Sequence, residues 1–302
     1  MPKTSREELL SRSLLERFAQ EKRRIIGDWR IQVEVRRIRL SEGAAQPDGN
    51  AILKLIRSMR RRADLTPIDD VPGVFLVTSP FAAVLPIAEE HVLQEAAPTS
   101  ALSHWSAIYL HGLTDEFPQT LHATVSRGKH AARIPLGTRP EDWSVYEPPP
   151  KNRLPKTAMG KRIEWHSVKD EWDFGVETAF VNALAVYATD LERTLIDALR
   201  APDDCGGAVM VFRAWRAARD RVSGDRLVQF AERFNSPLVK QRLGFVMDSL
   251  GFDHPALEDW RKDLRRGGSL KLIASAPYSS TYTERWNLSL NAPDAALAEL
   301  DD

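Results

Sequence analysis

The run from Tyr187 to Gly207 has the strongest local pattern in this chain of 302 residues. Thr189 stands three residues before Glu192, the spacing at which a hydroxyl and a carboxylate can cap the free amides at a helix start. The apolar positions that follow share one face of a 3.6-residue period: Leu191, Thr194, Leu195, Ala198 and Leu199. Pro202 and the glycine pair Gly206–Gly207 end the pattern. We expect a helix over residues 190–200, and its apolar face requires the rest of a folded domain to cover it.

A second patterned block runs from Ser103 to Pro118 and leads into alternating apolar residues at Leu121, Ala123 and Val125. It predicts a helix that begins at Thr99 or Ser100 and ends at Leu110, then a Gly-Leu-Thr turn and a strand over 121–126. A third, looser block at 242–251 predicts a short amphipathic helix closed by glycine.

Together these blocks resemble the AbiEi family, the antitoxin and autorepressor half of abortive-infection toxin–antitoxin pairs. The matched pieces lie within residues 80–290, with gaps between them. The resemblance implies a winged helix-turn-helix that binds the promoter DNA of its own operon and represses it. It also implies a C-terminal antitoxin domain that neutralises a nucleotidyltransferase-like toxin in phage defence, and it leaves open whether that domain touches the toxin. The helix over 190–200 would then contribute Glu192, Arg193 and Asp197 to the working surface. The alternative for these three residues is purely structural, with an exposed Arg193 paired to Asp197 one turn later.

Length and composition predict an ordinary globular protein of about two domains. The chain is 43% hydrophobic and 28% charged, has no apolar run of 18 residues, and begins without the apolar core of a signal peptide. We therefore expect a cytoplasmic protein with no membrane partner. The single cysteine, Cys205, predicts a buried thiol and neither a disulfide nor a metal site.

The formal net charge of zero conceals an uneven distribution. Residues 1–62 hold 16 Lys and Arg against 8 Asp and Glu, while the remainder holds 26 against 34. A basic segment joined to an acidic body is typical of a nucleic-acid-binding module attached to a different domain. The alternative is that these arginines are solvated helix faces without a partner.

The N-terminal pattern predicts a winged helix-turn-helix over 1–80. A long helix is expected over 5–26, with a Ser5–Glu8 capping box and Gly27 at its end, while 29–40 fits a strand or a helix equally. An acid-free helix over 50–62 leads directly into a β-hairpin over 65–77, the order in which a recognition helix precedes the wing. The expected DNA contacts are Asn50, Lys54, Arg57, Ser58, Arg61 and Arg62, with Arg36, Arg37 and Arg39 in reserve. Acids at the hairpin tip, Asp69 and Asp70, argue against phosphate contact by the wing.

The rest of the chain predicts an α+β fold in which an antitoxin domain over 81–293 has a helical second half, followed by a flexible tail over 294–302. An extended loop is expected over 146–155, around three consecutive prolines. Further strands are expected over 163–168 and 185–188. Helices are expected over 190–200, 207–222, 224–234, 237–250 with Ser236 as N-cap, and 255–265. A last strand over 283–290 is expected to rejoin the sheet.

No motif in the sequence predicts catalysis, a cofactor or a metal. His104 and His111 are seven residues apart, the phosphate-loop pattern is missing, and the clustered acids near 170 and 203 lack the spacing of a nuclease site. We expect a protein that is not an enzyme. Two rival functions remain open, a ligand-sensing or dimeric transcriptional regulator without a toxin, and a nucleic-acid-modifying enzyme.

Overall fold

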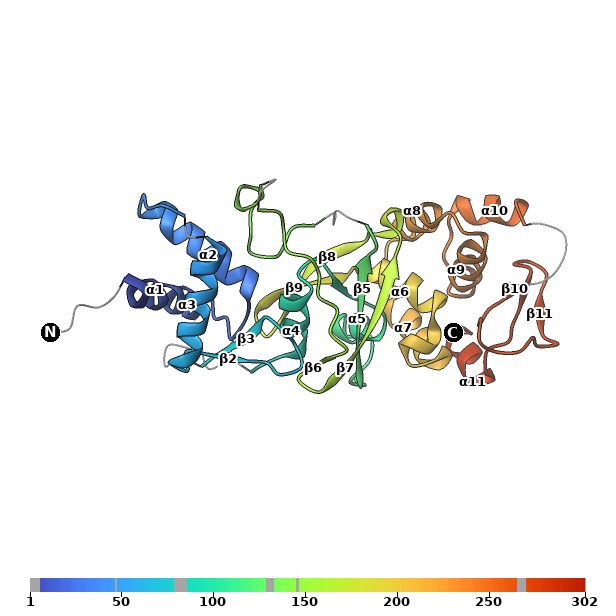
Figure 1. The fold of residues 1–302 in the computed structure, drawn as a ribbon. Coiled ribbons are helices and arrows are strands. Elements are labelled where there is room, and N and C mark those ends of the chain that lie inside the picture. The colour runs from blue at the N-terminus through green and yellow to red at the C-terminus, as the bar shows by residue number, and fades with distance from the viewer. Residues whose placement is uncertain are drawn as a thin grey trace. The chain divides into compact units, whose positions relative to one another are not determined.

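The computed structural model describes residues 6–46, 48–78, 86–128, 133–144, 147–264 and 270–301, and these residues form a mixed α+β fold (Figure 1). The chain divides into two compact units. Unit 1 comprises Met1–Ser100, His130–Ile163 and Thr178–Tyr187; unit 2 comprises Ala101–Lys129, Glu164–Glu177 and Ala188–Asp302. The units are interleaved along the sequence, whereas the domains expected from the sequence are consecutive stretches.

Unit 1 begins with three helices and a small antiparallel sheet (Figure 1). In chain order these elements are α1 (Arg6–Gln20), β1 (Ile25–Gly27), α2 (Asp28–Ser41), α3 (Gly49–Arg61), β2 (Leu65–Pro67) and β3 (Val74–Val77). The sheet has the order β1-β3-β2, with Ile25 opposite Leu76 and Leu65 opposite Val77. The helix expected over 50–62 and the hairpin expected over 65–77 are confirmed.

Apolar faces of all three helices meet in one core with the sheet. This core includes Leu14, Phe18, Ile31, Val35, Ile52, Leu55, Ile56, Met59, Leu65 and Val77. On α3 the buried positions are 52, 55, 56 and 59, the i, i+3, i+4, i+7 pattern of one helix face. Each such side chain contributes roughly 1.5–3 kcal/mol on burial, so the core orients α3 firmly.

The first helix is shorter than expected from the sequence, and the ambiguous segment after it is resolved by the structure. The first helix ends at Gln20 and not at Ile26, because Lys22 adopts a left-handed φ of 57° and Arg23 N donates to Phe18 O at 2.8 Å, a Schellman-type ending. The two isoleucines that follow become β1. The ambiguous segment over 29–40 is helical. The expected Ser5–Glu8 capping box starts at a residue outside the described ranges.

The remainder of unit 1 includes α4 (Glu89–Ala96), a 3-10 turn at Pro140–Asp142 and strand β6 (Thr157–Ala158). Residues 147–155 carry no helix or strand, as expected, while Tyr146 lies outside the described residues.

The larger sheet has the strand order β6-β7-β5-β4-β9-β8. Its other strands are β4 (Ala101–Leu102), β5 (Thr120–Ser126), β7 (Lys161–Val168), β8 (Val176–Val181) and β9 (Leu184–Thr189).

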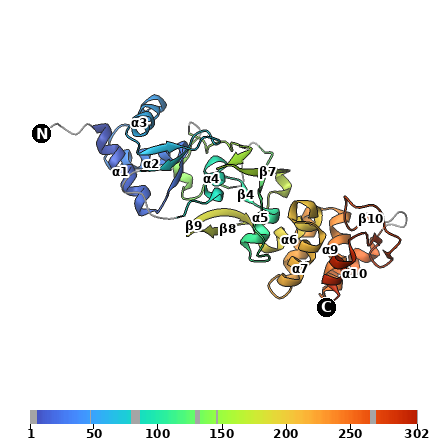
Figure 2. The ribbon, with the colours of Figure 1, turned by 90° about the horizontal axis from the view of Figure 1, so that it is seen from below.

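Unit 2 is mostly helical, and α6, α7, α9 and α10 gather around one core (Figure 2). The helices of unit 2 are α5 (His104–Leu110), α6 (Leu191–Arg200), α7 (Ala208–Ala218), α8 (Gly224–Phe234), α9 (Pro237–Ser249), α10 (Pro255–Lys262) and α11 (Asp294–Leu297). Three short 3-10 helices accompany them at Asp170–Trp172, Pro202–Cys205 and Ala298–Leu300. The helices expected from 190 onwards are confirmed, although α7 ends four residues early. No helix among the described residues is both long and apolar enough to cross a membrane.

Three expectations for unit 2 are wrong. The helix expected from Thr99 or Ser100 begins at His104, because Ala101 and Leu102 pair with Thr124 and Ala188 as β4. The strand expected over 283–290 does not rejoin the larger sheet. A turn at Asn287, with φ of 50°, splits it into β11 (Tyr282–Thr283) and β12 (Leu288–Ser289), and β12 pairs with both β11 and β10 (Leu270–Lys271) in a separate sheet.

The third of these is the C-terminal segment, expected as a flexible tail over 294–302. It forms α11 and a 3-10 turn that pack on α7. Ala296 and Leu300 are buried there, and Glu299 pairs with Arg213 and Arg216 of α7. Apolar residues at this four-residue spacing supply the burial that a tail lacks.

Candidate nucleic-acid interface

Helix α3 carries its cations on one exposed face and its apolar residues on the other. Lys54, Arg57, Arg60 and Arg61 are exposed, opposite the buried face that packs into the core of unit 1. The helix contains no acid. Asp48 precedes it as N-cap, and its Oδ1 accepts a hydrogen bond from Ala51 N at 2.7 Å.

A groove of about 810 Å³ lies between α3 and β2. It is lined by Lys54, Arg57, Arg60, Arg61, Ala63, Leu65, Thr66 and Pro67. No carboxylate lines it, and within the described part of the chain none of its four cations forms an ion pair. Among the residues that the structure describes, no acid balances the four positive charges that line this groove beside Ala63, Leu65 and Pro67.

The other residues expected on α3 are placed less favourably. Asn50 is exposed at the helix start. Arg62, at the helix end, pairs with Asp64 at 2.9 Å and donates to Ser58 Oγ at 2.9 Å, so both side chains have internal partners. Arg60 lines the groove and was not among the residues expected from the sequence. Its position three residues after Arg57 puts it on the same face, and that spacing would have identified it.

The reserve arginines of α2 are each held by acids of unit 1. Arg36 pairs with Glu147, and Arg39 pairs with Glu42 at 3.5 Å. Arg37 pairs with Asp142 and with Glu34, each at 2.6 Å, and the hydrogen bond to Asp142 raises the pKa of Arg37 above its ordinary value. Their charges are compensated within the protein, unlike those of α3.

Of the two acids at the turn between β2 and β3, Asp70 stabilises another turn of unit 1 through hydrogen bonds. Asp70 accepts hydrogen bonds from Gly160 N at 3.0 Å and Met159 N at 3.3 Å. Burial acts to raise the pKa of Asp70, but these hydrogen bonds and one from Thr157 outweigh it and lower the pKa below its usual value. Asp70 thus holds the turn between β6 and β7, while Asp69 is exposed.

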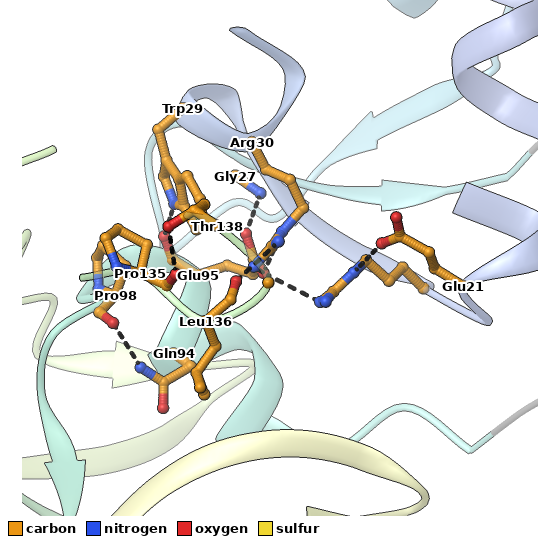
Figure 3. Close-up of polar contacts among 12 residues, drawn as sticks. Glu21, Gly27, Trp29, Arg30, Gln94, Glu95, Pro98, Pro135, Leu136 and Thr138 are labelled. Atoms are coloured by element: carbon orange, nitrogen blue, oxygen red, sulfur yellow. Dashed lines mark hydrogen bonds and ion pairs between the residues drawn. The ribbon is translucent and has the colours of Figure 1, made fainter. Parts of the chain in front are cut away.

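A buried ion pair joins α2 and α4 (Figure 3). Arg30 of α2 meets Glu95 of α4, with Nη2 2.6 Å from Oε1, and each residue is 3% exposed. Glu95 Oε2 also accepts from Gly27 N at 2.8 Å, and Trp29 Nε1 donates to Glu95 O at 2.9 Å. A Cβ at Gly27 would lie 2.6 Å from the Trp29 ring, so only glycine fits at this junction. These contacts connect α4 to the start of α2.

The helix that carries the family resemblance buries its charged residues. Arg193 is 1% exposed, and its Nε lies 2.7 Å from Asp197 Oδ2. Its Nη1 donates to Trp172 O at 2.7 Å and Phe174 O at 2.9 Å. The exposed Arg193 expected from helix periodicity is therefore wrong, because α5, α7, α8 and α9 all pack against α6.

Burial acts to raise the pKa of Asp197, but Arg193, His104 and Arg200 outweigh it and keep that pKa below the ordinary value. Asp197 is therefore a buried carboxylate with two arginine partners, since Arg200 Nη1 also lies 2.7 Å from its Oδ1.

The expected capping box at the start of α6 is also wrong. Asp190 is the N-cap, and its Oδ1 accepts from Arg193 N at 2.8 Å. Thr189 instead contacts Thr194 Oγ1 at 2.7 Å. Glu192 is 8% exposed and accepts from Ser223 N at 2.9 Å, which connects α6 to the start of α8. Glu192, Arg193 and Asp197 are thus brought together by the architecture of unit 2.

No family model matches the sequence, and no curated protein matches it. Among solved structures, the fold is similar to the crystal structure of the Rv2827c protein from Mycobacterium tuberculosis. The TM-score is 0.56 at 14% sequence identity, and the similarity covers 97% of this chain and 95% of that one. At this identity, the similarity concerns the fold alone.

Proposed function

We propose that this protein is the antitoxin of a bacterial toxin–antitoxin system, which binds its own promoter DNA, represses it, and counters a nucleotidyltransferase-like toxin in the cytoplasm. The observation that carries the DNA-binding half is the acid-free face of α3 beside β2, where four exposed cations have no internal partner among the described residues. Uncompensated Lys and Arg side chains on one face favour a polyanion, because binding releases the counterions of its phosphates.

The order of elements around α3 supports DNA rather than another polyanion. The element order α1, β1, α2, α3, β2, β3 supports the proposal of a winged helix-turn-helix, because in that motif the helix before the hairpin enters the major groove. Helix α3 has 13 residues, and an α-helix with its side chains is roughly 10–12 Å across, which fits a major groove about 12 Å wide. Arginines there can donate to phosphates and also in pairs of hydrogen bonds to guanine.

The toxin half of the proposal rests on the resemblance of residues 103–118 and 187–207 to the AbiEi family. Because Glu192, Arg193 and Asp197 are buried, we assign them to the support of unit 2 and not to contact with a toxin. A surface that opposes the toxin would lie on other, exposed parts of the chain.

The DNA-binding half is tested by fluorescence anisotropy with a labelled duplex from upstream of the protein's own coding sequence. The variant carries Lys54→Ala, Arg57→Ala and Arg61→Ala. The matched control removes three exposed cations of unit 2 by Arg213→Ala, Lys262→Ala and Arg285→Ala. We expect binding to be lost in the first and kept in the second. Equal affinity of both variants would contradict the assignment of α3.

The toxin half is tested by co-expression with the nucleotidyltransferase-like product of a neighbouring gene. The wild type and the α3 triple variant should both protect cells, if neutralisation is independent of repression. Failure of the wild type to protect would contradict the antitoxin assignment and favour a regulator without a toxin, whether or not DNA binding is found.

A further inference from the structure

Three histidines that are distant in sequence come together in unit 2. His104 is the first residue of α5, His122 lies on β5, and His166 lies on β7. The rings of His104 and His166 stack with centroids 3.7 Å apart, and His122 Nδ1 lies 3.1 Å from His166 Nε2. Asp204, in the 3-10 turn after α6, places its Oδ2 3.9 Å from His166 Nδ1. His104, His166 and Asp204 can each offer one ligand atom such that all three atoms lie within 4.8 Å of one another.

We propose that His104, His166 and Asp204 bind a divalent transition-metal ion of the Zn²⁺ class. Two imidazoles and a carboxylate are a donor set that Zn²⁺ accepts in tetrahedral geometry, with bonds of about 2.0–2.2 Å and a fourth position for water. Such bonds require donor atoms roughly 3.3–3.6 Å apart with each ring plane directed at the ion, so on binding Asp204 closes in and the stacked rings of His104 and His166 tilt toward the ion. Asp204 can make this movement, because its side chain is 41% exposed whereas His104 is 6% exposed.

The other ring nitrogens have partners of the kind that orient metal ligands. His104 Nδ1 lies 3.0 Å from Ser103 Oγ, which leaves its Nε2 for the ion. His166 faces Asp204 through Nδ1, and its Nε2 then donates to His122 Nδ1. His122 is thus a positioning residue that holds the plane of the His166 ring.

Acids lie around the ring of His166. Asp204, Asp197 and Glu164 act on it electrostatically, as does the cation Arg200, while burial lowers the pKa of His166 below its ordinary value and that of His104 to about 3. His104 also has a left-handed φ of 50°, a strained conformation for a residue with a side chain that is frequent at binding sites.

The proposal is independent of DNA and toxin binding, and its test requires neither. Full-length protein without a polyhistidine tag is stripped with a chelator and titrated with Zn²⁺ by calorimetry, while Co²⁺ is used to record ligand-field absorption. We expect one Zn²⁺ per wild-type chain, a Co²⁺ spectrum of tetrahedral intensity and a higher melting temperature with Zn²⁺. His166→Ala should lose the ion, and Asp204→Asn should weaken it at least tenfold.

The matched control is His254→Ala, which removes a partly buried histidine 3.0 Å from the Asp225 carboxylate in the same unit. It should keep one Zn²⁺ per chain. Circular dichroism of the metal-free variants checks their fold, and Asp204→Asn decides the matter if His166→Ala does not fold, since Asp204 is partly exposed and Asn has nearly the same shape. Absence of Zn²⁺ binding by the wild type, unchanged binding by Asp204→Asn, or loss of the ion in His254→Ala would overturn the assignment.

Discussion

Helices α3 and α6 have similar sequence patterns and opposite uses of arginine. Both have an apolar stripe at helical spacing and several charged residues opposite it. In α3 the cations are exposed, and none forms an ion pair within the described residues. In α6 the cation Arg193 is buried and held by Asp197.

Both helices carry arginines, and they differ in whether an acid lies one turn away from the arginine. A buried guanidinium is stable only with acceptors, and α6 supplies one at i+4 while neighbouring carbonyls supply more. Helix α3 has no acid to offer, so its arginines have to remain solvated or bind an external anion.

Replacing Arg193 with Ala should have the largest effect on stability. The change leaves Asp197 buried with only Arg200 as a cationic partner, and breaking a buried pair in this way typically costs about 3–5 kcal/mol. Urea unfolding of the full chain measures the loss. Arg213→Ala, at a half-exposed surface pair, is the control and should change stability by less than about 0.5 kcal/mol. A cost for Arg193→Ala as small as that of the control would remove the contrast between the two helices.

Replacing Glu95 with Gln should destabilise unit 1 by a smaller but clear amount, about 2–4 kcal/mol. The amide cannot neutralise Arg30, which burial already drives toward a lower pKa. The double variant Arg30→Met with Glu95→Leu should lose less unfolding free energy than Arg30→Met and Glu95→Leu lose separately when their losses are added. In the double variant no charge is left unpaired. Strict additivity in the unfolding free energies would show that the two side chains are not coupled.

Single substitutions on α2 and α3 should separate compensated from uncompensated arginines in DNA binding. Arg57→Ala should weaken binding to promoter DNA, by several-fold at low salt, because it removes a free cation from the groove. Arg37→Ala should change the affinity little, since its charge is already balanced by Asp142 and Glu34. Anisotropy titrations compare the two, and a larger loss in Arg37→Ala would move the interface to α2.

Local patterns predicted what is local in the structure. The helix over 50–62, the hairpin after it and the helices after 190 follow from periodicity within one segment. The strand character of Ile25 and Ile26 depends on partners distant in sequence, Leu76 and Phe75. The splitting of the last strand depends on the left-handed turn at Asn287, which the alternation of apolar residues does not reveal. The burial of Arg193 likewise depends on four helices that no local pattern reveals.

The histidine cluster could not be predicted for the same reason. His104, His122 and His166 share no metal-binding spacing, and they meet only because β5 and β7 are neighbours in the sheet and α5 follows β4. The excess of Lys and Arg in residues 1–62 indicated a basic surface, whereas no sequence pattern indicated this cluster.

The most direct test of the account is the salt dependence of promoter binding by the wild type and by a variant with Lys54, Arg57, Arg60 and Arg61 all changed to Ala. Each cation that contacts a phosphate contributes about 0.9 to the slope of log K against log salt concentration. We predict that the slope of the variant is shallower by about 2–4, with the fold kept intact by the buried face of α3. An equal slope for the two proteins would contradict the claim that the exposed face of α3 binds DNA.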